Sequence, residues 1–80
     1  MNREQLFDRI QNIFRDIFDD ENLIIEDITN AADIDEWDSL NQINLVVAIE
    51  QEFKVKFNFQ ELSQLKNVGE MVDLTMQKLN

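Results

Sequence analysis

Residues 38–53 read DSLNQINLVVAIEQEF, and their apolar residues recur at the spacing of an α-helix. Asp38 and Ser39 are both common N-cap residue types, so we expect the helix to begin at Ser39 and to run to about Phe53. One apolar face should be buried, and it comprises Leu45, Ile49 and Phe53, with Val46 beside them. A second apolar face comprises Leu40, Ile43 and Val47. The pattern alone favours burial of both faces in a bundle, with a partner-binding surface as the alternative.

The flanking sequence predicts two more long helices. Residues 3–18 and 67–79 each place their apolar residues on a single stripe. The first stripe is formed by Leu6, Ile10, Ile13, Phe14 and Ile17. The second is formed by Val68, Met71, Val72, Thr75 and Leu79. Asn67 is expected to cap the last helix, with Glu70 three residues later.

A short helix is expected at residues 58–64. Asn58 suits its N-cap position, and Glu61 follows three residues later, in the register of a capping box. Phe59 and Leu62 are expected to anchor this helix to the core.

Residues 19–38 show no clean helical or strand period, so they are expected to form a long ordered loop. Scattered apolar residues should hold this loop on the core: Leu23, Ile24, Ile25, Ile28, Ile34 and Trp37. A lone strand at residues 23–25 would have no partner and is not expected. The sequence therefore predicts one all-α domain over residues 1–80, a small four-helix bundle with three longer helices, one short helix and a long first connection.

The composition limits the functions open to the chain. An 80-residue chain forms one domain at most. The absence of Cys and His removes disulfides and the usual zinc and thiol chemistry. Seventeen Asp and Glu against seven Lys and Arg give a net charge of −10, which would repel nucleic acid. Such a field can steer basic protein partners, although the charge can also serve solubility alone.

Several other classes of protein and site are not indicated. No stretch resembles a signal peptide or a membrane span, so we expect a cytoplasmic protein, with a monomer as the default. Asp33, Asp35 and Asp38 lie close together, but an EF-hand loop would also need a central glycine and a final glutamate that the sequence lacks. Since no His or Cys can pair with a serine, we expect no catalytic residue and no metal site.

The junction of the long loop with the central helix suits a phosphate ester. The first amides of a helix lack partners within the helix, and the helix dipole places partial positive charge there. Together they can stabilise a phosphodiester on the hydroxyl of Ser39. A simple N-cap formed by Asp38 or Ser39 is the alternative, and the three residues 38–40 do not decide between the two by themselves.

Residues 38–40, with the sequence Asp-Ser-Leu, and the residues around them resemble the acyl carrier protein family over nearly the whole chain. The matching positions downstream are Ile43, Leu45-Val46, Ala48-Ile49-Glu50, Glu52-Phe53 and Val68-Gly69-Glu70. The resemblance implies that Ser39 accepts a 4′-phosphopantetheine arm from coenzyme A, with Asp38 and Leu40 completing the motif. The thiol of the arm would hold acyl intermediates as thioesters and shuttle them between enzymes of a biosynthetic pathway. The protein would then be a carrier and not an enzyme.

The resemblance also implies a docking surface. In this family the helix that follows the serine is the recognition helix, so Leu40, Ile43 and Val47 would be exposed contacts and not core residues. Glu50 matches an acidic contact to basic residues of partners. The implied partners are a phosphopantetheinyl transferase and the acyl-loading and processing enzymes, with basic docking patches.

The sequence departs from the family pattern near the serine. Asn41 and Asn44 stand where many members have acids, and no glycine precedes the motif. These departures favour a specialised stand-alone carrier, while fatty-acid, polyketide and lipopolysaccharide-type pathways all stay open. Trp37 is expected to anchor the loop, with packing against the arm or a partner as the alternative. The alternative function is an unmodified acidic interaction module that uses the same exposed apolar face.

Overall fold

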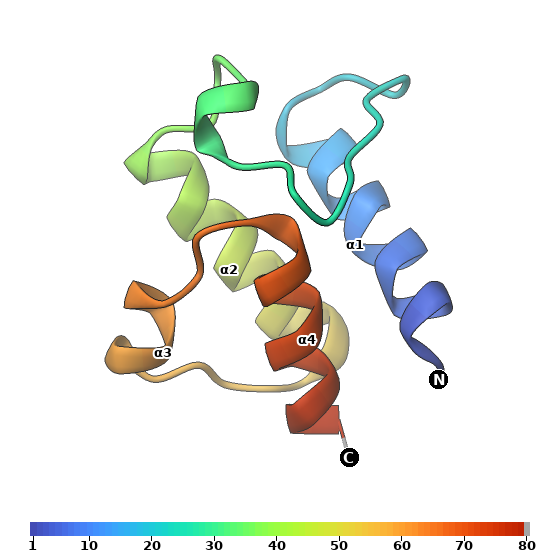
Figure 1. Cartoon of the computed structure of the whole chain (residues 1–80), viewed down its shortest axis with the longest axis vertical. Coiled ribbons are helices and arrows are strands. Elements are labelled where there is room, and N and C mark those ends of the chain that lie inside the picture. Colours follow the sequence, from blue (N-terminus) through green and yellow to red (C-terminus); the bar gives the residue numbers. More distant parts are fainter. Residues whose placement is uncertain (80) are drawn as a thin grey trace.

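The computed structural model describes residues 1–79, which form four α-helices and one 3₁₀ turn. The elements are α1 (Arg3–Ile17), η1 (Ala31–Asp33), α2 (Ser39–Phe53), α3 (Phe59–Ser63) and α4 (Val68–Leu79). The three longer helices are α1, α2 and α4, and the short α3 lies to one side of them (Figure 1). No strand occurs in the described residues. The predicted all-α bundle is therefore confirmed.

The central helix α2 has the bounds that its sequence predicted. The carboxylate of Asp38 accepts the backbone N–H of Asn41 at 2.8 Å, which fixes the start of the helix. Lys54 ends it in the left-handed conformation, with φ 56° and ψ 46°. A left-handed residue cannot continue a right-handed helix, so the chain leaves α2 directly after Phe53.

The other helix starts follow the same capping chemistry. Asn58 and Glu61 form the predicted capping box of α3, with both hydrogen bonds at 2.8 Å. The side chain of Asn67 accepts the backbone N–H of Glu70 at 2.9 Å, so it caps α4 as expected. Asn2 and Gln5 form a further capping box at the start of α1, which the sequence analysis did not anticipate. Short polar side chains before each helix therefore set its first residue.

The core lies between α1, α2 and α4. Its largest fully buried side chains include Phe14, Leu6, Ile10, Leu45, Ile49, Met71 and Val72. Phe53 is buried with them, and Thr75 is buried with its hydroxyl donated to the carbonyl of Met71 at 2.7 Å. Leu79, at the end of the predicted stripe of α4, is 37% exposed. The predicted inner face of α2 is thus confirmed as core.

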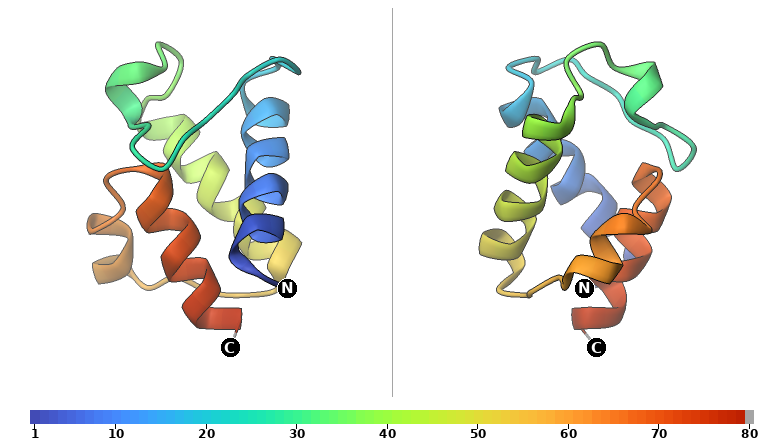
Figure 2. Two further views of the ribbon diagram at one scale, coloured as in Figure 1. Left: turned by 45° about the vertical axis from the view of Figure 1, so that its right-hand side comes forward. Right: turned by 90° about the vertical axis from the view of Figure 1, so that its left-hand side faces the viewer.

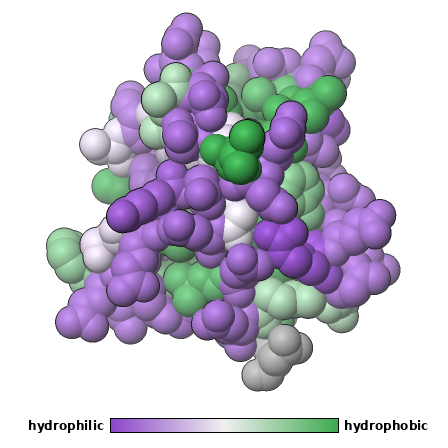
Figure 3. Space-filling view, in the orientation of Figure 1, coloured by the Kyte–Doolittle hydropathy of each residue, from purple (hydrophilic) through white to green (hydrophobic). Residues whose placement is uncertain are grey.

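The long connection between α1 and α2 runs across one end of the bundle (Figure 2). Ile25, Ile34 and Trp37 are buried and hold it on the core, as predicted. The expectation was wrong for Ile24 and Ile28, which are 75% and 76% exposed. The backbone N–H of Ile25 donates to the side chain of Gln11 of α1 at 3.0 Å, which ties this part of the loop to the bundle. Adjacent side chains outside a helix point in different directions, so with Ile25 buried its neighbour Ile24 faces the solvent. Apolar residues on the face drawn in Figure 3 form small separate patches on a largely hydrophilic surface.

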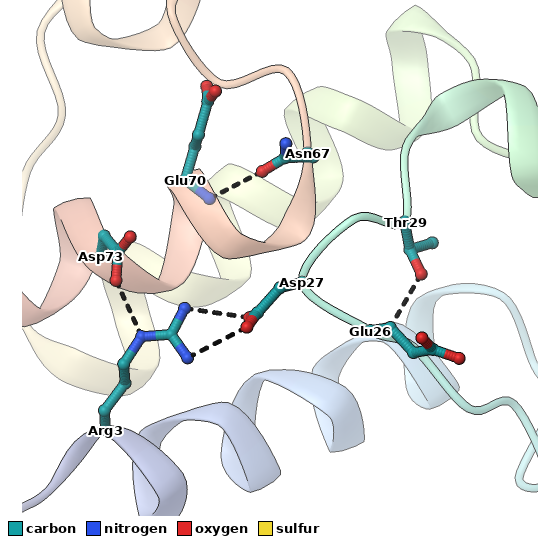
Figure 4. Close-up of polar contacts among 7 residues, drawn as sticks. All are labelled: Arg3, Glu26, Asp27, Thr29, Asn67, Glu70 and Asp73. Carbon is teal, nitrogen blue, oxygen red and sulfur yellow. Dashed lines mark hydrogen bonds and ion pairs between the residues drawn. The ribbon is translucent and has the colours of Figure 1, made fainter.

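The connection is also tied to α4 (Figure 4). The backbone N–H groups of Val68 and Gly69 donate to the carbonyls of Thr29 and Asp27, each at 2.9 Å. These loop carbonyls satisfy two of the amides that the start of a helix leaves unpaired. The guanidinium of Arg3 bonds the carboxylate of Asp27 at 2.9 Å and that of Asp73 at 2.8 Å. Helices α1 and α4 therefore hold the same stretch of loop from two sides.

The prediction that Phe59 anchors α3 was wrong, because its side chain is 88% exposed. Leu62 is only half-buried. A helix of five residues has one narrow inner face, so the residues that flank it do the anchoring instead. Phe57 and Leu65 pack against the core, and Glu61 forms an ion pair with Lys78 of α4 at 2.9 Å.

Across residues 1–79, no helix combines the length and the apolar character that crossing a lipid bilayer requires.

Candidate functional site

Ser39 is the first residue of α2 and lies exposed at the surface. None of the hydrogen bonds among residues 1–79 uses its hydroxyl group. The helix cap is supplied by Asp38 and not by Ser39. The simple N-cap interpretation therefore applies to Asp38, and the serine hydroxyl stays free for chemistry.

Trp37 fixes the position of this helix start. Its ring packs edge-on against Phe14 of α1, with ring centres 5.2 Å apart and an interplanar angle of 83°. Its indole N–H donates to the side chain of Gln42 at 2.7 Å, and its backbone N–H donates to the carbonyl of Ile34 at 3.0 Å. Trp37 is thus the loop anchor that the sequence predicted. Ser39 lies two residues after Trp37, so the start of α2 is held close to the core.

The amides at the start of α2 are less available than the sequence implied. The carboxylate of Asp38 accepts the N–H of Asn41 at 2.8 Å. The bond from the N–H of Gln42 to the carbonyl of Asp38, at 2.9 Å, is the first backbone bond of the helix itself. The side-chain amide of Asn41 donates to the carbonyl of Glu36 at 2.7 Å, and that of Asn44 donates to Asn41 at 3.2 Å. A phosphate on Ser39 would therefore meet one neighbouring carboxylate and a reduced set of donors.

An open groove of about 550 Å³ begins at Ser39. One wall comes from the start of α2 and includes Trp37 and Ile43, and the other includes Leu62 and Leu65, from α3 and the residues after it. The lining is mainly apolar, and its polar residues are Asp38, Ser39, Gln42 and Lys66. A flexible arm with a phosphate at one end and an alkyl amide chain beyond it fits this distribution of groups.

The outer face of α2 is exposed, so burial of both faces was wrong. Leu40, Ile43 and Val47 are 66%, 60% and 42% exposed. Leu45 and Ile49, on the other face, are 0% and 1% exposed. Three exposed apolar side chains therefore lie on one side of a helix that begins at Ser39.

Glu50, the predicted acidic contact to partners, also forms hydrogen bonds within the fold. One of its carboxylate oxygens accepts the backbone N–H of Phe57 at 2.9 Å, and the side chain is half-buried. Its carbonyl accepts the N–H groups of Lys54 and Val55. Glu50 therefore secures the connection between α2 and α3, and its predicted contact with partners stays a prediction.

Leu65 and Lys66 also line the groove beside Ser39, and the sequence did not predict them as site residues. No motif or spacing relates these residues to the serine, because they reach the groove from the connection between α3 and α4. Only the tertiary packing brings the two segments together.

Comparisons with known proteins agree with this geometry. A family model described as the phosphopantetheine attachment site matches residues 8–75. An acyl carrier protein of Petrotoga mobilis is 35% identical, over 100% of this chain and 94% of the relative. An acyl carrier protein of Coprothermobacter proteolyticus is 32% identical, over 92% of this chain and 90% of the relative.

Solved structures give the same result. The holo acyl carrier protein of Geobacter metallireducens is 46% identical with a TM-score of 0.88, over 92% of this chain and 85% of that chain. The acyl carrier protein of Thermotoga maritima is only 23% identical and shows the shared fold alone, with a TM-score of 0.84 over 99% of this chain and 92% of that chain.

Proposed function

This chain belongs to the acyl carrier protein family, and we propose that its 4′-phosphopantetheine arm is attached at Ser39. Members of the family carry intermediates for biosynthetic enzymes and are not themselves catalysts. The observation that carries the proposal is the exposed, unbonded hydroxyl of Ser39 at the first position of a helix whose cap is supplied by another residue.

The attachment is a transfer from coenzyme A. The hydroxyl oxygen of Ser39 bonds the phosphorus that carries the pantetheine, and the hydroxyl proton passes to a base of the transferase. The bond from that phosphorus to the bridging oxygen of the diphosphate breaks, and adenosine 3′,5′-bisphosphate leaves with that oxygen. When attached, the arm supplies a thiol that holds acyl groups as thioesters. The protein contributes the rigid helix start set by Trp37 and Asp38, and the groove beside it.

The outer face of α2 is the proposed docking surface for the phosphopantetheinyl transferase and for the acyl-loading and processing enzymes. Leu40, Ile43 and Val47 would supply the apolar contacts. The net charge of −10 would attract enzymes with basic patches and speed their encounter. Glu50 would contribute with the carboxylate oxygen that Phe57 leaves unused.

The first two turns of α2 contain no acidic residue, which distinguishes this chain from carriers whose helix begins with acidic residues. Asn41 and Asn44 bond to Glu36 and to each other, and neither carries charge. We propose a specialised carrier whose dedicated enzymes rely less on basic contacts at this turn. We also propose that residues 1–80 form one carrier domain and that the protein is a monomer. We propose a cytoplasmic location as well, because the modification consumes coenzyme A.

The chain offers a matched control for a test of the attachment site. Its second serine, Ser63, is also exposed, but it lies at the end of α3 and donates its hydroxyl to the carbonyl of Gln60 at 2.7 Å. Wild type, Ser39→Ala and Ser63→Ala are each incubated with coenzyme A, magnesium and a promiscuous phosphopantetheinyl transferase. Intact-mass spectrometry then counts the arms on each protein.

We expect wild type and Ser63→Ala to gain one arm and Ser39→Ala to gain none. A gain that persists in Ser39→Ala would place the arm on another residue. No gain in wild type, under conditions that modify a control carrier, would support the unmodified interaction module instead.

A further inference from the structure

The groove beside Ser39 has one cationic residue in its lining. Lys66 follows α3, is exposed, and lines the same groove of about 550 Å³ as Ser39 and Asp38. Its backbone N–H donates to the carboxylate of Glu70 at 3.1 Å, but no ion pair among residues 1–79 uses its ammonium group. Lys66 thus lines the groove, and its ammonium group has no ion-pair partner among the described residues.

The other cations of the chain are not placed for this site. Four of them already bond acceptors elsewhere in the described residues: Arg3, Arg9, Arg15 and Lys78. Lys54 and Lys56 follow the end of α2 that is opposite Ser39. Lys66 is therefore the cation that the fold offers to a group attached at the serine.

A nearby cation would stabilise a phosphodiester at Ser39. Its negative charge would lie beside the carboxylate of Asp38, on a chain of net charge −10, and like charges repel. The helix start offsets this less than an uncapped one would, because the carboxylate of Asp38 already accepts the amide of Asn41. A cation on the opposite wall of the groove would offset the repulsion between the phosphodiester and the carboxylate of Asp38.

We propose that the ammonium group of Lys66 pairs with the phosphodiester at Ser39 and directs the arm into the groove. This proposal rests on the proposed function, since it requires the arm to be attached at Ser39. Lys66 acts here as a positioning residue that holds the start of the arm beside Leu65. Ile43 lines the groove and also belongs to the outer face of α2, so Leu40 and Val47 are the residues of that face that stay open for docking.

The pairing is tested by titrating the lysines of the apo and holo proteins. The holo protein is prepared with coenzyme A, magnesium and a promiscuous transferase, and its mass is checked first. The pKa of each lysine ammonium is then measured by NMR from the carbon next to it. A full negative charge within about 6 Å in water raises an ammonium pKa by roughly half a unit, so we expect a rise of that size at Lys66 and none at Lys56.

A pair of variants gives a second measurement. Lys66→Gln should shift the phosphorus resonance of the holo protein, while Lys56→Gln, which removes the same charge at an exposed site, should leave it unchanged. Equal pKa changes at the two lysines, or a phosphorus resonance indifferent to Lys66→Gln, would overturn the pairing and leave the proposed function intact. No mass gain in wild type would overturn both.

Discussion

The two faces of α2 can be compared by making the same change on each. Ile43 and Ile49 lie in one helix, but their side chains are 60% and 1% exposed. Replacing either with Val removes one methylene and changes helix propensity equally. At Ile49 the loss is about 0.8 kcal/mol for transfer and about 0.6 kcal/mol for the cavity left by a group of roughly 25 Å³. The side chain of Ile43 is 60% exposed, so only the part that is already covered contributes to its transfer loss, which is about 0.3 kcal/mol.

Urea unfolding followed by the fluorescence of Trp37, the single tryptophan, measures both losses. Trp37 is buried against Phe14, so unfolding exposes it to water. We expect Ile49→Val to lower the free energy of unfolding by about 1.4 kcal/mol and Ile43→Val to lower it by about 0.3 kcal/mol. Equal losses at the two positions would refute the assignment of Ile43 to an exposed docking face. An unchanged slope of free energy against urea would show that both variants unfold from the same compact state.

Three further changes test the loop contacts and α3. Gly69→Ala should lower stability by about 1 kcal/mol in thermal unfolding, because its methyl group would lie 3.1 Å from a bonded loop carbonyl and the clash outweighs the gain in helix propensity; a stabilised variant would contradict this packing. Phe59→Ser should change the urea midpoint little, since the ring is 88% exposed, and a loss above about 1 kcal/mol would show that it is buried after all. The backbone N–H of Asn58 and the ammonium of Lys78 hold the pKa of Glu61 below its ordinary value. Because the folded-state pKa is lowered, Glu61 stabilises the fold above its ordinary pKa, and this contribution is lost as the pH falls through the lowered one. Glu61→Gln should therefore unfold at less urea than wild type at neutral pH, with the difference closing in acid; a difference independent of pH would contradict the ion pair.

Local sequence signals were sufficient for the helices. The bounds of α2 followed from the cap at Asp38 and from the period of its apolar residues, and the capping box at Asn58 located α3. These signals depend on residues within one turn of each other. The position of Ser39 at the start of α2 was predictable for the same reason.

The remaining features depend on contacts between distant segments. The sequence could not show that Ile25 is buried while Ile24 is exposed, because the choice depends on how this part of the loop packs on the core. Nor could it place Lys66 in the groove of Ser39, since the two walls come from separate parts of the chain. The exposed face of α2 was implied by resemblance to a family, whereas the periodicity alone favoured its burial.

One measurement reaches the site of attachment directly. The protein is purified from its own source and fragmented in the mass spectrometer, so that the arm is located on a single residue. We predict a phosphopantetheine on Ser39 and an unmodified Ser63. A Ser39 that is always bare, or an arm found on any other side chain, would contradict the assignment of this helix start as the carrier site.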